Sequence, residues 1–117
     1  MSKWEVNLPS DVSQWFLNLG TDEAETVAGA IDLLEDAGPT LGRPTVDSIK
    51  GSKHHLMKEL RPAGTNIRIL FAFDPAREAI LLVAGDKTGQ WKSWYKDNIP
   101  VADMRFDDWK AQREAGE

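Results

Sequence analysis

Residues 57–87, MKELRPAGTNIRILFAFDPAREAILLVAGDK, contain the pattern that decides the fold. Segments 56–61, 67–73 and 79–84 have the composition of strands, and turn-forming residues separate them at 61–66 and at Asp74-Pro75. This arrangement is typical of an antiparallel meander. The third segment is apolar on both faces, which predicts a strand that is central or covered on both sides. The basic residues of the stretch either carry chemistry or form a solvated face.

The residues before this stretch predict one strand and two helices. Trp4, Val6 and Leu8 alternate with polar residues, as in a half-buried strand. Apolar residues recur at helical spacing in 10–19 and again in 21–38. Helices joined by so short a connection form an antiparallel hairpin, which we expect to cover one face of the sheet. Residues 39–53 show no convincing periodicity and are expected to form an ordered loop.

The residues after the meander have helical spacing. Trp91, Trp94 and Tyr95 fall at i, i+3 and i+4, and Pro100 is placed where a second helix would begin. We therefore expect short C-terminal helices, with residues 112–117 frayed. The length of 117 residues is typical of one domain, so we expect a single α+β domain over 1–117.

Composition excludes several classes of protein. The chain has no cysteine, which rules out disulfides, a thiol nucleophile and thiolate metal sites. No apolar run approaches the about 20 residues of a membrane span, and the N-terminus lacks the apolar core of a signal peptide. We expect a soluble cytoplasmic protein that needs no cofactor to fold and has no membrane partner.

The net charge of −5 argues against nucleic-acid binding, but the charges are unevenly distributed. Residues 1–42 contain one lysine and eight acids, a balance of −7. Residues 43–68 contain six bases and two acids, a balance of +4, and residues 69–117 have a balance of −2. The basic segment could present a local anion-binding surface beside an acidic helical half. Ordinary charged surface is an equal alternative.

The segment LMKELRPAGTNIRILFAFD, followed by AILLVAGDK, resembles the RelE/HigB branch of the RelE/ParE toxin superfamily. In detail it is similar to the phage Gp49-like HigB subgroup, and the likeness covers most of the chain. The resemblance implies a RelE-like α+β fold with a twisted antiparallel sheet. It also implies an mRNA endonuclease that usually acts on the ribosome. The implied partners are a co-encoded helix-turn-helix antitoxin of the HigA type, mRNA and the ribosomal A site.

Independently of the resemblance, the residues favour chemistry without a metal. The sequence has no H-E-x-x-H, P-loop or G-x-S-x-G motif and no paired acids above chance. When the ribose 2′-OH attacks the adjacent phosphate, the enzyme need only align the groups and stabilise the developing charge. Arg61 and Arg68 lie across one predicted hairpin and Lys87 leaves the next strand, so one sheet face or edge could gather all three.

The resemblance implies roles for these residues. Arg68 matches the arginine of the third family strand, which braces the scissile phosphate, and Arg61 matches a phosphate-contacting arginine. Lys87 matches the lysine at the strand exit, where it either stabilises the leaving group or is a solvated charge. Structural ion pairs are the alternatives for both arginines. Glu59 is a candidate general base, although an ion pair with Arg61 is favoured.

The acid and base of the reaction are less clear from the sequence. His54 and His55 are the two histidines, and an imidazole titrates near neutral pH. Both precede the active strand, and His55 is the catalytic candidate, with ordinary surface as the alternative. Tyr95 could take the role of the family's C-terminal tyrosine, but its helical phase with Trp91 favours core packing.

RelE-like proteins have two lysines where this chain has Met57 and Glu59, so another lysine would have to replace their charge. The candidate RNA-binding residues are the bases on and around the motif: Lys50, Lys53, His54, Lys58, Lys92 and Lys96. Trp91, Trp94 and Tyr95, which are interleaved with the last two lysines, either stack on bases or belong to the core or an antitoxin interface, and their shared helical face favours the second interpretation.

The sequence therefore predicts a metal-independent endoribonuclease toxin that inhibits translation. The alternative is a non-nucleolytic protein that acts by protein binding, either on gyrase as in the ParE branch or on an antitoxin alone.

Overall fold

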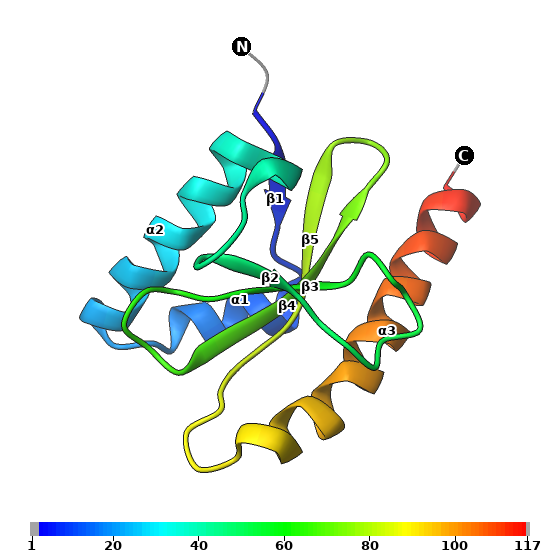
Figure 1. The fold of residues 1–117 in the computed structure, drawn as a ribbon. Coiled ribbons are helices and arrows are strands. Elements are labelled where there is room, and N and C mark those ends of the chain that lie inside the picture. The colour runs from blue at the N-terminus through cyan, green and yellow to red at the C-terminus, as the bar shows by residue number, and fades with distance from the viewer. Residues whose placement is uncertain (1–2, 117) are drawn as a thin grey trace.

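A five-stranded mixed sheet with the order β1-β5-β4-β3-β2 forms the centre of the computed structural model, which describes residues 3–116 (Figure 1). Its strands are β1 Glu5–Asn7, β2 Val46–Ser48, β3 Lys58–Leu60, β4 Ile67–Asp74 and β5 Glu78–Asp86. The predicted meander is confirmed, because β3, β4 and β5 pair antiparallel in sequence order. β1 differs by joining the outer side of β5 in parallel, which leaves β5 inside the sheet as predicted.

Helices cover both faces of the sheet (Figure 1). The helices are α1 Ser10–Leu17, α2 Thr21–Ala37 and α3 Trp91–Ala115, with a short 3-10 helix at Gly38–Thr40. One core packs α1 and α2 against side chains such as Leu60, Ile69 and Phe71. A second core packs α3 against Leu70, Ala72 and Ile80. Adjacent strand residues point to opposite faces, so β4 supplies both cores. This α+β architecture is consistent with the RelE-like fold that the resemblance implies.

Two expectations about the regular elements were wrong. The segment 39–53 contains β2, whose three residues are too few to show a period; Val46 is buried opposite Leu60. The C-terminal region forms one helix of 25 residues instead of several short ones, and it includes residues 112–115. Pro100 removes one backbone hydrogen bond inside α3. Its ring is exposed, while Ile99 and Ala102 on either side are buried against the sheet, so packing keeps the helix continuous.

No helix within residues 3–116 is both long enough and apolar enough to cross a membrane.

Candidate active site

Five side chains meet on the sheet face that α3 covers, near the first turns of that helix. They are Glu59 of β3, Arg61 just after it, Arg68 of β4, Lys87 just after β5, and Tyr95 of α3. The backbone fixes this meeting. Arg68 is two residues from Leu70, which packs under α3, and residues two apart on a strand share a face. The Lys87 N–H donates to the Asn66 carbonyl at 3.0 Å, which holds Lys87 beside the start of β4.

Glu59 is the centre of this group and is 3% exposed. Its Oε2 accepts hydrogen bonds from Arg61 Nε at 3.0 Å and Arg61 Nη2 at 2.7 Å. Its Oε1 accepts the Tyr95 hydroxyl at 2.6 Å and lies 3.8 Å from Arg68 Nε. A buried carboxylate requires such partners, because an unpaired charge is very unfavourable away from water. The predicted ion pair of Glu59 with Arg61 is therefore present.

Arg68 is held by the hairpin that precedes it. Its Nη1 donates to the carbonyl of Ile67 at 2.7 Å and more weakly to that of Thr65 at 3.3 Å. Its Nε is buried and has no hydrogen-bond partner within residues 3–116. A buried guanidinium donor without an acceptor is unusual in a native protein. Arg68 therefore keeps a donor for an additional anion while its position is fixed by backbone carbonyls.

Lys87 is a buried lysine whose ammonium group contacts aromatic rings. Its Nζ donates to the Tyr95 hydroxyl at 3.1 Å and lies 4.4 Å from the ring centroid of Trp91. Burial lowers the pKa of Lys87, the positive charge of Arg68 lowers it further, and the charge of Glu59 partly opposes the change. A lysine of this kind gives up its proton more readily than an exposed one.

Tyr95 connects the carboxylate with the lysine. Its hydroxyl donates to Glu59 and accepts from Lys87. Burial, followed by the hydrogen bond to Glu59, raises the pKa of Tyr95 to about 12. The phenol is therefore protonated at neutral pH, where it acts as a donor and not as a base.

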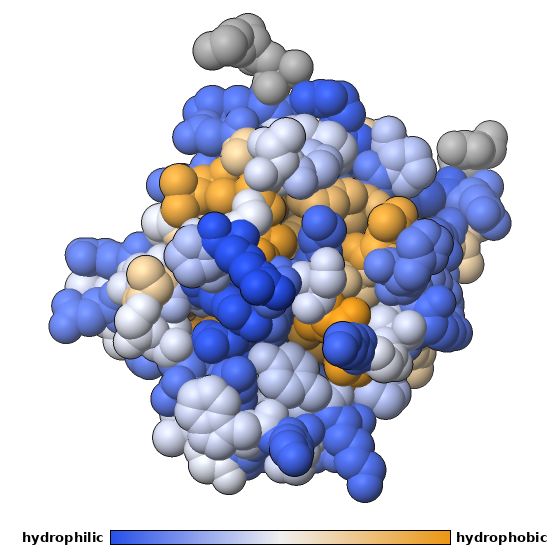
Figure 2. Space-filling model, in the orientation of Figure 1, coloured by the Kyte–Doolittle hydropathy of each residue, from blue (hydrophilic) through white to orange (hydrophobic). Residues whose placement is uncertain are grey.

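A shallow open pocket of about 400 Å³ lies over four members of this group, and Arg68 lines a neighbouring pocket that it shares with Arg61. The wall of the first pocket includes Lys50 together with Glu59, Arg61, Lys87 and Tyr95. Figure 2 shows a strongly hydrophilic band over the region where β2, β3 and β4 lie in Figure 1, with apolar surface on both sides. Arg61, Arg68 and Lys87 against the carboxylates of Glu59 and Asp47 leave a formal excess of one positive charge. The arrangement can hold an anion.

The predicted residues Lys53 and His54 lie elsewhere. Lys53 forms an ion pair with Asp107 of α3, and His54 Nε2 is 2.9 Å from the same carboxylate. The buried Asp103 accepts the Ser52 hydroxyl and the Lys53 N–H, so this loop is fastened to α3. These contacts give both residues a structural role.

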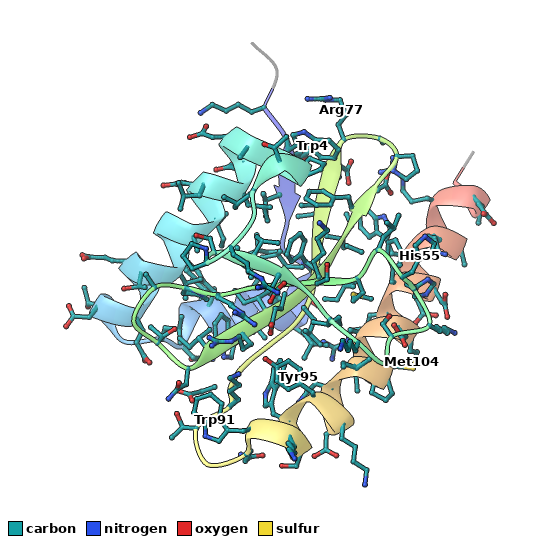
Figure 3. All side chains as sticks on the ribbon, in the orientation of Figure 1. Trp4, His55, Arg77, Trp91, Tyr95 and Met104 are labelled. Carbon is teal, nitrogen blue, oxygen red and sulfur yellow. The ribbon has the colours of Figure 1, made fainter. Side chains whose placement is uncertain are left out.

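The remaining candidates are dispersed. Lys58 alternates with Glu59 along β3, so its side chain starts from the opposite sheet face. His55 is exposed and lies along α3 away from Tyr95 (Figure 3). Lys92 and Lys96 are exposed on the first turns of α3. Within residues 3–116, no three His, Asp or Glu side chains are placed to hold a metal ion together.

Sequence reasoning missed two neighbours of the site. Asp47 of β2 lies 3.3 Å from Arg61 Nη2 and pairs in register with Glu59, but β2 itself was not foreseen. Trp91 was grouped with Trp94, although it is Trp94 that is buried and Trp91 that stands exposed beside Lys87. The signal available in the sequence was that Trp91 lies at the start of α3, where the apolar pattern changes from the period of a strand to that of a helix.

Comparison with known proteins places this chain in a family. The model of the phage-derived Gp49-like proteins matches residues 14–107. HigB3 of Mycobacterium tuberculosis (strain ATCC 25618 / H37Rv), which is named as a candidate toxin, is 60% identical over 95% of this chain and 97% of its own. HigB2 of the same strain, also named as a candidate toxin, is 49% identical over 88% of this chain; the match spans about half of HigB2, 53%. The protein therefore belongs to the phage-derived Gp49-like family.

Proposed function

We propose that this protein is the toxin of a type II toxin–antitoxin pair and that it cleaves mRNA without a metal ion. Two relatives named as candidate toxins support the biological role. The observation that carries the chemistry is the meeting of Arg61, Arg68 and Lys87 around Glu59 and Tyr95. Arg61 lines two open pockets there, one with Lys87 and the other with Arg68. Cations arranged in this way suit a phosphate whose charge increases in the transition state.

In the proposed reaction the 2′-hydroxyl of the RNA releases its proton to solvent water, its oxygen forms a bond to the neighbouring phosphorus, and the bond from phosphorus to the 5′-oxygen breaks. The products are a 2′,3′-cyclic phosphate and a 5′-hydroxyl end. Arg68 turns its guanidinium and Arg61 turns one of its donors from Glu59 to the phosphate. Lys87, with its lowered pKa, gives a proton to the leaving 5′-oxygen.

Cleavage on the ribosome is part of the proposal. The pocket is shallow and open, so it can contact a phosphate but holds little of a flexible strand. In-line attack requires the RNA to be fixed in a narrow range of geometries. mRNA held in the ribosomal A site meets this requirement. We further propose that a helix-turn-helix antitoxin inhibits this protein. We also propose that this protein acts in the cytoplasm, where mRNA is translated.

Induced expression of the wild type, Arg68→Ala and Arg68→Lys, followed by mapping of mRNA 5′ ends that carry a hydroxyl, tests the proposal. We expect growth arrest and new 5′-hydroxyl ends with the wild type. Arg68→Ala should reduce the cleavage rate by about 100-fold or more, because one donor at a developing charge contributes that much. Arg113→Ala is the matched control. Arg113 is an exposed arginine near the end of α3 that pairs with Glu78 of β5, so its substitution should leave cleavage unchanged.

Growth arrest by the wild type without new 5′-hydroxyl ends would contradict the nuclease mechanism and would favour the alternative of action by protein binding, for example on gyrase. An adjacent reading frame for a small helix-turn-helix protein would support the toxin assignment.

A further inference from the structure

Trp91 is a large exposed aromatic side chain that the fold does not use. It is 54% exposed and does not take part in the core beneath α3, whereas Trp94, three residues later, is 5% exposed and fills that core. Exposed tryptophans are uncommon because the indole ring is the largest apolar surface a side chain offers. Core packing therefore accounts for Trp94 and leaves Trp91 without a structural role.

The position of Trp91 is fixed by the turn that joins β5 to α3. The Gln90 N–H donates to the Lys87 carbonyl at 2.9 Å, and Gly89 in this turn has a φ of 75°. The Trp94 N–H then donates to the Gln90 carbonyl at 2.7 Å, which starts the helix. As a result Trp91 and Tyr95 lie at the same end of α3 (Figure 3). The ammonium of Lys87 lies between the two rings, 4.4 Å from the Trp91 centroid and 5.0 Å from that of Tyr95.

The surroundings of the ring are cationic. Lys87 touches the ring, Lys92 follows it on an exposed position, and the first turn of α3 contains no acid. The N-terminal end of a helix also carries a partial positive charge. A flat aromatic surface beside cations suits single-stranded RNA, because a base stacks on the ring while the cations hold its phosphate.

We propose that Trp91 is the stacking platform for an RNA base next to the phosphate held by Arg61, Arg68 and Lys87. This inference rests on the proposed function and adds a substrate-positioning residue to it. The cation–π contact with Lys87 orients the ring before RNA binds and links base stacking to the reacting phosphate. Trp91 thus positions the nucleotide for cleavage, and Trp94 supports the helix beneath it.

The test uses single-stranded RNA oligonucleotides that are 2′-deoxy at the scissile nucleotide and carry one abasic position, moved along the strand. Fluorescence anisotropy gives the affinity of the wild type, Trp91→Ala and Trp91→Phe. We expect Trp91→Ala to weaken binding roughly 5- to 150-fold, the range for one stacked base. One abasic position should weaken binding of the wild type but not of Trp91→Ala, and Trp91→Phe should restore most of the affinity. Met104→Ala is the matched control, because Met104 is 55% exposed on the same helix.

Mapping of cleaved mRNA ends separates this inference from the proposed function. If the wild type produces 5′-hydroxyl ends and Trp91→Ala produces the same ends at the same frequency with the same neighbouring bases, the stacking inference is wrong and the nuclease stands. If the wild type produces no 5′-hydroxyl ends, the nuclease proposal is wrong, and the binding of abasic oligonucleotides alone tests whether a base stacks on Trp91. Equal affinity of Trp91→Ala and the wild type for every oligonucleotide, with loss only of antitoxin binding, would overturn the inference in favour of a protein interface.

Discussion

Replacing Glu59 by glutamine should lower stability and raise affinity for anions at the same time. Glu59 is almost fully buried and accepts three hydrogen bonds at 3.0 Å or less. Glutamine has nearly the same shape but no charge, so Arg61 and Arg68 lose their shared buried counter-charge. Removing one partner of a fully buried ion pair costs about 3–5 kcal/mol. Arg61 is 33% exposed and can be hydrated, and the amide oxygen still accepts one bond, so we expect about 1–3 kcal/mol.

Urea unfolding at pH 7 measures this change, with the free energy of unfolding taken from the midpoint and slope. Asp47→Asn is the matched control, because Asp47 also pairs with Arg61 but lies nearer the surface. It should cost no more than about 1 kcal/mol. Sulfate should raise the urea midpoint of Glu59→Gln more than that of the wild type, because the excess of positive charge has grown. A loss below about 0.5 kcal/mol, or an equal response to sulfate, would show that Glu59 does not neutralise the cluster.

Three further predictions follow from other contacts. Tyr95 is the single tyrosine, so the ultraviolet absorbance of tyrosinate reports it alone: its pKa should be about 12 in the folded protein and 10.0 in urea. The folded protein keeps the phenol proton at pH values where the unfolded chain has lost it, so the free energy of unfolding should fall as the pH rises from 10.0 to about 12. A titration midpoint near 10 in the folded protein would contradict the burial of Tyr95 beside Glu59. Gly85→Ala should lower the free energy of unfolding in urea by about 1–3 kcal/mol, because the new Cβ would lie 2.8 Å from Trp94 Nε1. In the control Gly29→Ala, in α2, the new Cβ meets nothing within 4 Å, and the protein should be stabilised by up to about 1 kcal/mol. Equal effects of the two substitutions would refute the close packing at Gly85. Asp103→Ala removes the buried acceptor of the loop before β3 and should cost about 1–3 kcal/mol by the same measurement; an unchanged midpoint would show that the loop is held by other contacts.

The sequence was sufficient for the elements that bury many residues in a regular pattern. The alternation around Ile69 and Phe71 and the apolar run from Ala79 to Ala84 identified β4 and β5, because a half-buried strand has period two and a doubly covered strand has none. The sequence failed where packing overrode local preference. Three-residue β2 is stabilised by its pairing with β3, and α3 passes through Pro100 because buried neighbours hold both halves against the sheet.

The candidate site divides in the same way. The sequence by itself predicted that Arg61, Arg68 and Lys87 come from three adjacent strand ends, which one sheet face or edge could gather. Only the tertiary structure decided that the Tyr95 hydroxyl donates to Glu59, that Asp107 pairs with Lys53 and His54 away from the site, and that Trp91 faces solvent. The contact between His54 and Asp107, for example, joins residues 53 positions apart. Local patterns fix the direction of a side chain, but its partner depends on how the elements pack in three dimensions.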